Sequence, residues 1–77
     1  MTPTEKHNAL ARDFVMRVAS ETKTDSDMMV VVESSLFAAM LILQRQHGVK
    51  PIICTEMVDM AVQQAMERFA ALQDRRP

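Results

Sequence analysis

Hydrophobic residues recur at helical spacing in the first part of the chain. Leu10, Phe14 and Val18 follow one another at intervals of four positions, which places them on one side of an α-helix. Charged residues occupy the opposite side. The pattern predicts an amphipathic helix over residues 3–22 with one face turned toward a core.

The middle of the chain is apolar over a longer stretch, from Met28 to Leu43. The run from Met29 to Val32, taken alone, is typical of a β-strand. The apolar pattern continues far beyond the usual length of a strand, however, and no turn residue interrupts it before residue 48. We therefore expect a second helix over residues 25–47.

A third helix is expected over residues 52–73, followed by a frayed tail at residues 74–77. Its start has two alternatives, at Pro51 or four residues later with Thr55 as the N-cap. One face of this helix is apolar and the opposite face is polar. The apolar face consists of Cys54, Val58, Ala61, Val62, Ala65, Phe69 and Leu72.

Start and stop signals agree with these three segments. Thr2 before Pro3 is a favourable beginning for the first helix, and Thr24 followed by Asp27 is a favourable beginning for the second. Gly48 is a typical left-handed residue at the end of a helix. Because the connections are short, consecutive helices are predicted to be antiparallel, which gives a single all-α domain over the whole chain, a small antiparallel three-helix bundle.

The second helix carries more apolar surface than a three-helix bundle needs. Besides a broad apolar face, it has a narrow stripe of Val30, Phe37 and Leu41, which in an isolated bundle would point into water. Glu33 and Arg45 flank this stripe on opposite sides. We predict a two-fold homodimer interface at these five residues, with Glu33 of one chain near Arg45 of the other in an antiparallel pair. The alternative is that the chain's own first helix covers the stripe.

Composition narrows the range of possible activities. The chain has 77 residues, of which 48% are hydrophobic and 25% are charged, and its net charge is -1. This is the profile of a folded domain. One glycine, one cysteine and two histidines leave too few residues for a phosphate-binding loop, a disulfide or a multi-cysteine zinc site. We predict no enzymatic activity and no cofactor or metal site.

Sulfur-containing residues are frequent, since the chain has eight methionines. Cys54, Met57 and Met60 have spacings that suggest a copper(I) site, but helix geometry turns Met60 away from the other two. Methionine also suits irregular packing and adaptable contact surfaces. We therefore interpret the methionines as packing and contact residues, and Cys54 as a buried, inert thiol.

The balanced charge offers no general attraction to nucleic acid or to an anionic membrane. The middle apolar run is interrupted by Glu33, Ser34 and Ser35 and is shorter than a typical membrane span. The first residues do not have the pattern of a secretory signal. We expect a cytoplasmic, non-enzymatic interaction or regulatory module that acts as a homodimer, with an unidentified protein partner left open. The alternative is a nucleic-acid-associated transcriptional regulator that uses basic residues near the C-terminus, namely Arg68, Arg75 and Arg76.

Overall fold

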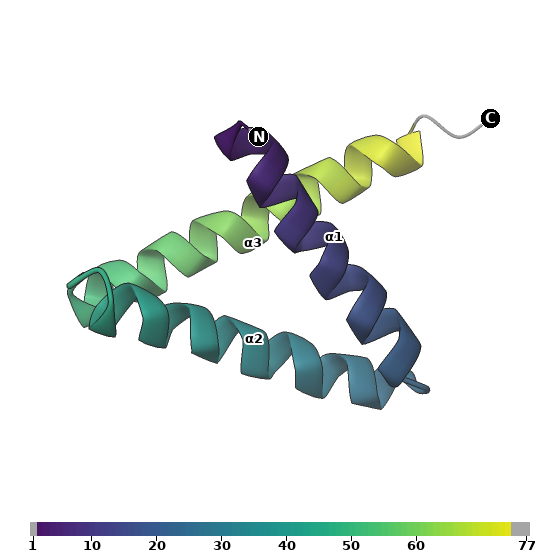
Figure 1. Cartoon of the computed structure of the whole chain (residues 1–77), viewed down its shortest axis with the longest axis horizontal. Coiled ribbons are helices and arrows are strands. Elements are labelled where there is room, and N and C mark those ends of the chain that lie inside the picture. Colours follow the sequence, from purple (N-terminus) through teal and green to yellow (C-terminus); the bar gives the residue numbers. More distant parts are fainter. Residues whose placement is uncertain (1, 75–77) are drawn as a thin grey trace. The chain divides into compact units, whose positions relative to one another are not determined.

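The computed structural model describes residues 2–74 and contains three α-helices in this range (Figure 1). α1 spans Pro3–Glu21, α2 spans Asp25–Arg45 and α3 spans Pro51–Asp74. No strand occurs among the described residues. The prediction of an all-α, three-helix fold is confirmed. The run from Met29 to Val32 lies inside α2, so the longer apolar pattern determined its conformation rather than its local strand character.

The beginnings of α1 and α2 are fixed by threonine side chains. The Oγ1 atom of Thr2 accepts a hydrogen bond from the backbone N–H of Glu5 at 3.1 Å. Thr24 does the same for Asp27 at 3.0 Å, and the Asp27 carboxylate accepts from the N–H of Lys23 at 3.2 Å. These bonds satisfy N–H groups that have no partner inside the helix, which explains why both helices begin where they do.

The end of α1 uses a threonine instead of a glycine. Thr22 has an extended backbone, with φ -98° and ψ 131°. Both its backbone N–H and its hydroxyl donate to the carbonyl of Val18, at 2.9 and 2.7 Å. The chain then reaches α2 through residues 22–24.

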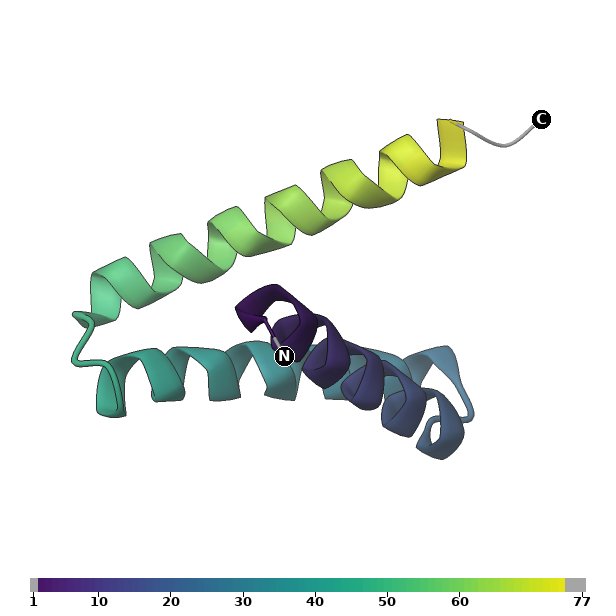
Figure 2. The same cartoon turned by 45° about the horizontal axis from the view of Figure 1, so that its top comes forward.

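The end of α2 depends on Gly48. Its φ of +67° is the only positive φ among the described residues. The N–H of Val49 bonds back to the carbonyl of Leu43 at 3.0 Å, so a free carbonyl of the last helical turn is satisfied. This connection reverses the chain, and the last turns of α2 and the first turns of α3 lie side by side (Figure 2). The expected left-handed cap is therefore observed.

α3 begins at Pro51, and the alternative beginning with Thr55 as N-cap is wrong. Proline is suited to the first position of a helix because its ring fixes φ and its missing N–H is not needed there. The Thr55 hydroxyl instead donates to the carbonyl of Ile52 at 2.7 Å, inside the helix. The expected tail at 74–77 lies outside the described residues except for Asp74, which ends α3.

The chain divides into two compact units, Met1–Ser34 and Ser35–Pro77. The first unit contains α1 with the beginning of α2, and it has no fully buried residue among those described. The second unit contains the rest of α2 with α3, and Cys54, which is 2% exposed, is its only buried residue in the described range. The division falls within α2, which remains a continuous helix.

The apolar face of α1 is not buried in its own unit, contrary to the sequence prediction. Val18 is half-buried, but Leu10 is 60% exposed, and Phe14 and Val15 are also exposed. Phe14 and Val18 line an open groove between α1 and the beginning of α2, so this face of α1 is not closed over within the unit.

We predict that Gly48→Ala lowers the free energy of unfolding by about 1 kcal/mol, because a Cβ atom at positive φ is strained. A Cβ atom there would meet nothing within 4 Å, so the effect comes from the backbone rather than from a clash. Urea unfolding followed by circular dichroism, at a fixed protein concentration, measures it. Gly48→Asn is the matched control, since asparagine tolerates the left-handed region, and it should lose less. Equal stability of the alanine variant and the unchanged protein would contradict this account.

Candidate interaction surface

α2 carries the predicted stripe on a single uninterrupted helix. Val30, Phe37 and Leu41 are separated by seven and four positions, and this spacing keeps them on one side of an α-helix. Their exposures differ. Val30 is 65% exposed and Phe37 is 56% exposed, whereas Leu41 is half-buried. Two of the three apolar residues of the stripe are thus open to water.

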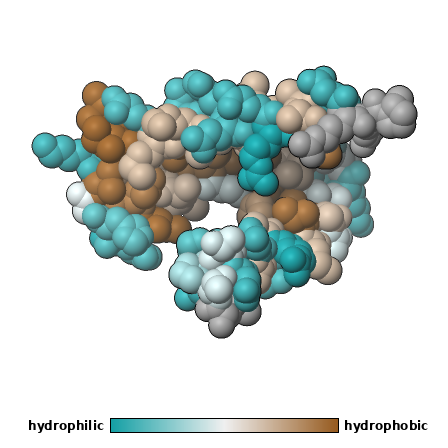
Figure 3. All heavy atoms as spheres, turned by 90° about the horizontal axis from the view of Figure 1, so that it is seen from above, coloured by the Kyte–Doolittle hydropathy of each residue, from teal (hydrophilic) through white to brown (hydrophobic). Residues whose placement is uncertain are grey.

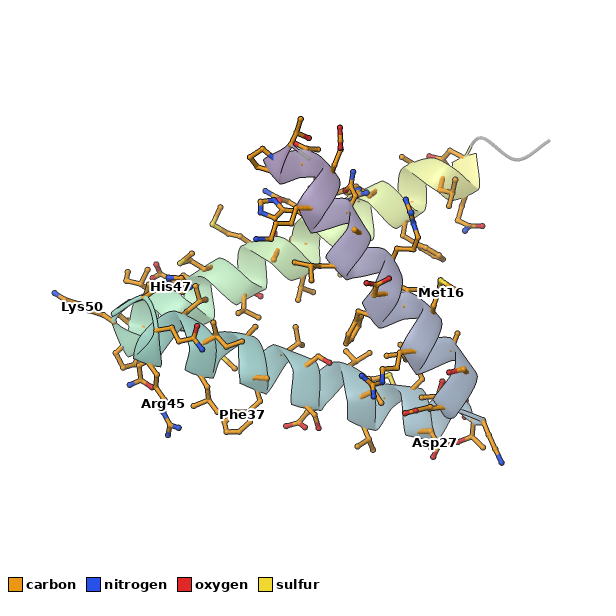
Figure 4. All side chains as sticks on the ribbon, in the orientation of Figure 1. Met16, Asp27, Phe37, Arg45, His47 and Lys50 are labelled. Atoms are coloured by element: carbon orange, nitrogen blue, oxygen red, sulfur yellow. The ribbon has the colours of Figure 1, made fainter. Side chains whose placement is uncertain are left out.

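Within the second unit, Phe37 points away from the packed side of α2. Figure 4 shows the side chains of Phe37 and Arg45 on the side of α2 that faces away from α3. Ala39, Met40 and Leu43 are half-buried, as are Val58 and Val62 on α3. The broad apolar face of α2 therefore supplies the contacts of this unit, and the Phe37 side remains uncovered.

Charged residues beside the stripe are exposed. The Glu33 carboxylate accepts a hydrogen bond of 3.4 Å from the hydroxyl of its neighbour Ser34, and Arg45 extends from the last turn of α2. Along the helix these two residues are 12 positions apart, about 18 Å. They are too distant to pair within one copy of α2, so both charges are available to another molecule.

In the first unit, Val30 also borders an open groove between α1 and α2. Apolar residues and charged residues of both signs line it. The groove is lined by Phe14, Arg17, Val18, Glu21, Thr22, Asp27, Val30 and Val31. Sequence periodicity assigned Phe14 and Val18 to a core and Val30 to an external stripe, and it therefore missed that these residues share one groove.

The second half of α3 is another exposed apolar region that the sequence assigned to the core. Phe69 is 64% exposed and Leu72 is also exposed, and both line a shallow hollow with Ala65, Arg68 and Ala71. α3 has 24 residues, about 36 Å, whereas its unit contains only residues 35–45 of α2, about 16 Å. The rest of α3 is therefore uncovered within its own unit.

The start of α3 is exposed on one side and buried on the other. Ile52 and Ile53 are exposed, and apolar atoms reach the surface at the end of the molecule that carries the α2–α3 connection (Figure 3). Cys54 faces inward, and its Sγ atom lies 3.5 Å from the carbonyl oxygen of Val49. The prediction that Cys54 is buried is confirmed.

Metal-binding residues do not assemble in the described part of the chain. No group of three or more histidine, cysteine, aspartate or glutamate residues among residues 2–74 is placed to hold a metal ion. Met60, like Met16 in Figure 4, is exposed. Of the basic residues proposed for nucleic acid, Arg68 lies on α3, while Arg75 and Arg76 lie outside the described residues.

By length and composition α2 is sufficient to cross a membrane. It is the one such helix in the described range, and no part of its apolar window is buried. The core helix of a soluble protein and a signal sequence have the same length and apolar character. No protein family, no curated protein and no solved structure matches the chain.

Cys54 gives a direct test of packing between α2 and α3. We predict that a thiol reagent such as dithionitrobenzoate labels Cys54 in the folded protein at least tenfold more slowly than in the urea-unfolded chain, because the thiol is buried. The control is Cys54→Ala combined with Gln63→Cys, which places the thiol on an exposed position of α3. Equally fast labelling of both folded proteins would show that Cys54 is not shielded.

Proposed function

We propose that the chain is a non-enzymatic interaction or regulatory module of the cytoplasm that acts as a homodimer, with the side of α2 that carries Phe37 as its contact surface. This contact surface consists of Val30, Glu33, Phe37, Leu41 and Arg45. The observation that carries the proposal is the position of Phe37, a large apolar side chain that is 56% exposed and directed away from α3.

The energetics of a small chain support association. A single core in a chain below about 70–80 residues rarely supplies more than about 3–5 kcal/mol. Here Cys54 is the only buried residue of the described range, and it forms no disulfide. Complete burial of one phenylalanine or leucine contributes about 1.5–3 kcal/mol, so covering a few exposed residues has an effect as large as that core. A second copy of the chain can cover these residues, and the resulting gain in stability increases with protein concentration.

A protein partner is favoured over insertion of α2 into a membrane. Glu33 lies two residues from the middle of α2, where a bilayer would be most apolar. A charged residue at the centre of a membrane helix costs about 2.5–3.5 kcal/mol on insertion scales. Ser34 and Ser35 follow directly and add further polar groups. At a protein interface Glu33 would stay at the wet margin, where its charge costs little.

The variant Phe37→Asp is expected to weaken self-association at least tenfold while helicity is retained, because a charge replaces the largest apolar side chain of the contact surface. Sedimentation equilibrium at micromolar concentration measures the change, and circular dichroism monitors helicity. Gln63→Asp is the control. It adds the same charge to an exposed position of α3, outside the contact surface, and should leave association nearly unchanged.

Two outcomes would overturn the proposal. The first is an unchanged protein that sediments as a monomer at high micromolar concentration. The second is association lost equally in the two aspartate variants. Flotation with phosphatidylcholine and phosphatidylglycerol vesicles distinguishes membrane binding from dimer formation. A helical monomer that binds these vesicles through α2 would show that lipid covers the contact surface.

A further inference from the structure

The order of residues along the contact surface of α2 has an internal symmetry. Phe37 and Leu41 lie two positions before and after Ala39, and Glu33 and Arg45 lie six positions before and after it. In an antiparallel pair related by a two-fold axis, residues at equal distances on either side of the axis become level with each other. One placement of the axis therefore aligns both the apolar residues and the charged residues.

We infer that two copies of α2 pair in antiparallel orientation with the two-fold axis level with Ala39. The inference rests on the proposed function and specifies its partner, a second copy of this chain, and its register. Phe37 of each copy is then level with Leu41 of the other copy, and Glu33 is level with Arg45 of the other copy.

Charge complementarity selects the antiparallel orientation. In a parallel pair Glu33 lies beside Glu33 and Arg45 beside Arg45, and like charges at such positions are unfavourable. In the antiparallel pair each glutamate is level with an arginine, twice by symmetry, and the two side chains reach each other across the stripe because they flank it on opposite sides. These charges are exposed, so they determine orientation more than strength.

The continuity of α2 permits this register. α2 is a regular helix over Asp25–Arg45, so the alignment continues across all four positions. Val30 lies nine positions before Ala39, whereas α2 of the other copy ends six positions after it, at Arg45, so Val30 lies beyond the aligned part of the two helices.

Cross-linking distinguishes the orientations. Ser34 and Gln44 lie five positions before and after Ala39, both are exposed, and both lie beside the contact surface. In the proposed register, a cysteine at position 34 is level with a cysteine at position 44 of the other copy, whereas two cysteines at position 34 are about 15 Å apart along the helix. Ser34→Cys and Gln44→Cys proteins are mixed, treated with a short bis-maleimide and separated by mass.

The expected result is that the mixed 34–44 product exceeds the sum of the 34–34 and 44–44 products at least fivefold. The unchanged protein, with only the buried Cys54, is the control for background labelling. Predominant 34–34 and 44–44 products would show a parallel pair. That outcome overturns the register but leaves the homodimer intact. Dimers in sedimentation without any cross-linked product would place the contact on another surface, and a monomeric protein would overturn the proposed function itself.

Charge reversal provides an independent readout. Glu33→Arg alone and Arg45→Glu alone should each weaken association about two- to fivefold in low salt, because each places like charges level with each other. The double variant should recover most of the loss. If the double variant associates more weakly than either single variant, the charges do not pair across the interface.

Discussion

The burial of apolar side chains is the constraint on which this fold depends. Each unit contains one long helix that packs against about half of α2. Within its own unit, each of these helices, of 19 and 24 residues, meets only about ten residues of α2 and is not covered along its whole length. Leu10 on α1 and Phe69 on α3 are exposed for this reason. The chain thus has well-formed helices and very little buried surface within each unit.

Local hydrogen bonds determine where the helices begin and end, and they require no core. Thr2, Thr24 and the Gly48 turn satisfy backbone groups that would otherwise be unpaired. Each such cap contributes about 1 kcal/mol, which is enough to position a helix boundary but not enough to hold three helices in place. Short connections and firm caps therefore define the elements, while apolar contacts have to stabilise their arrangement.

α2 is the helix that presents apolar residues on more than one side. It contributes half-buried residues to the contact with α3 through Ala39, Met40 and Leu43, and it also exposes Phe37 on another side. A helix that is apolar on two sides is suited to contacts on both. Glu33 lies near the middle of α2, and its carboxylate has to stay hydrated in any contact on the second side. The margin of a protein interface meets this condition, whereas the interior of a lipid bilayer does not.

The amino-acid sequence by itself determined the all-α class, the three helices and the caps at Thr2, Thr24 and Gly48, because spacing, threonine and glycine act over a few neighbouring residues. It also determined that Cys54 lies on an apolar face, and the structure confirms that this thiol is buried. Only the tertiary structure decided which apolar faces are covered. Helical periodicity placed Phe14, Phe69 and Leu72 in a core, yet all three are exposed. Periodicity shows that a face is apolar, whereas burial depends on the length and position of the neighbouring helix, and neither is encoded in the pattern of one segment.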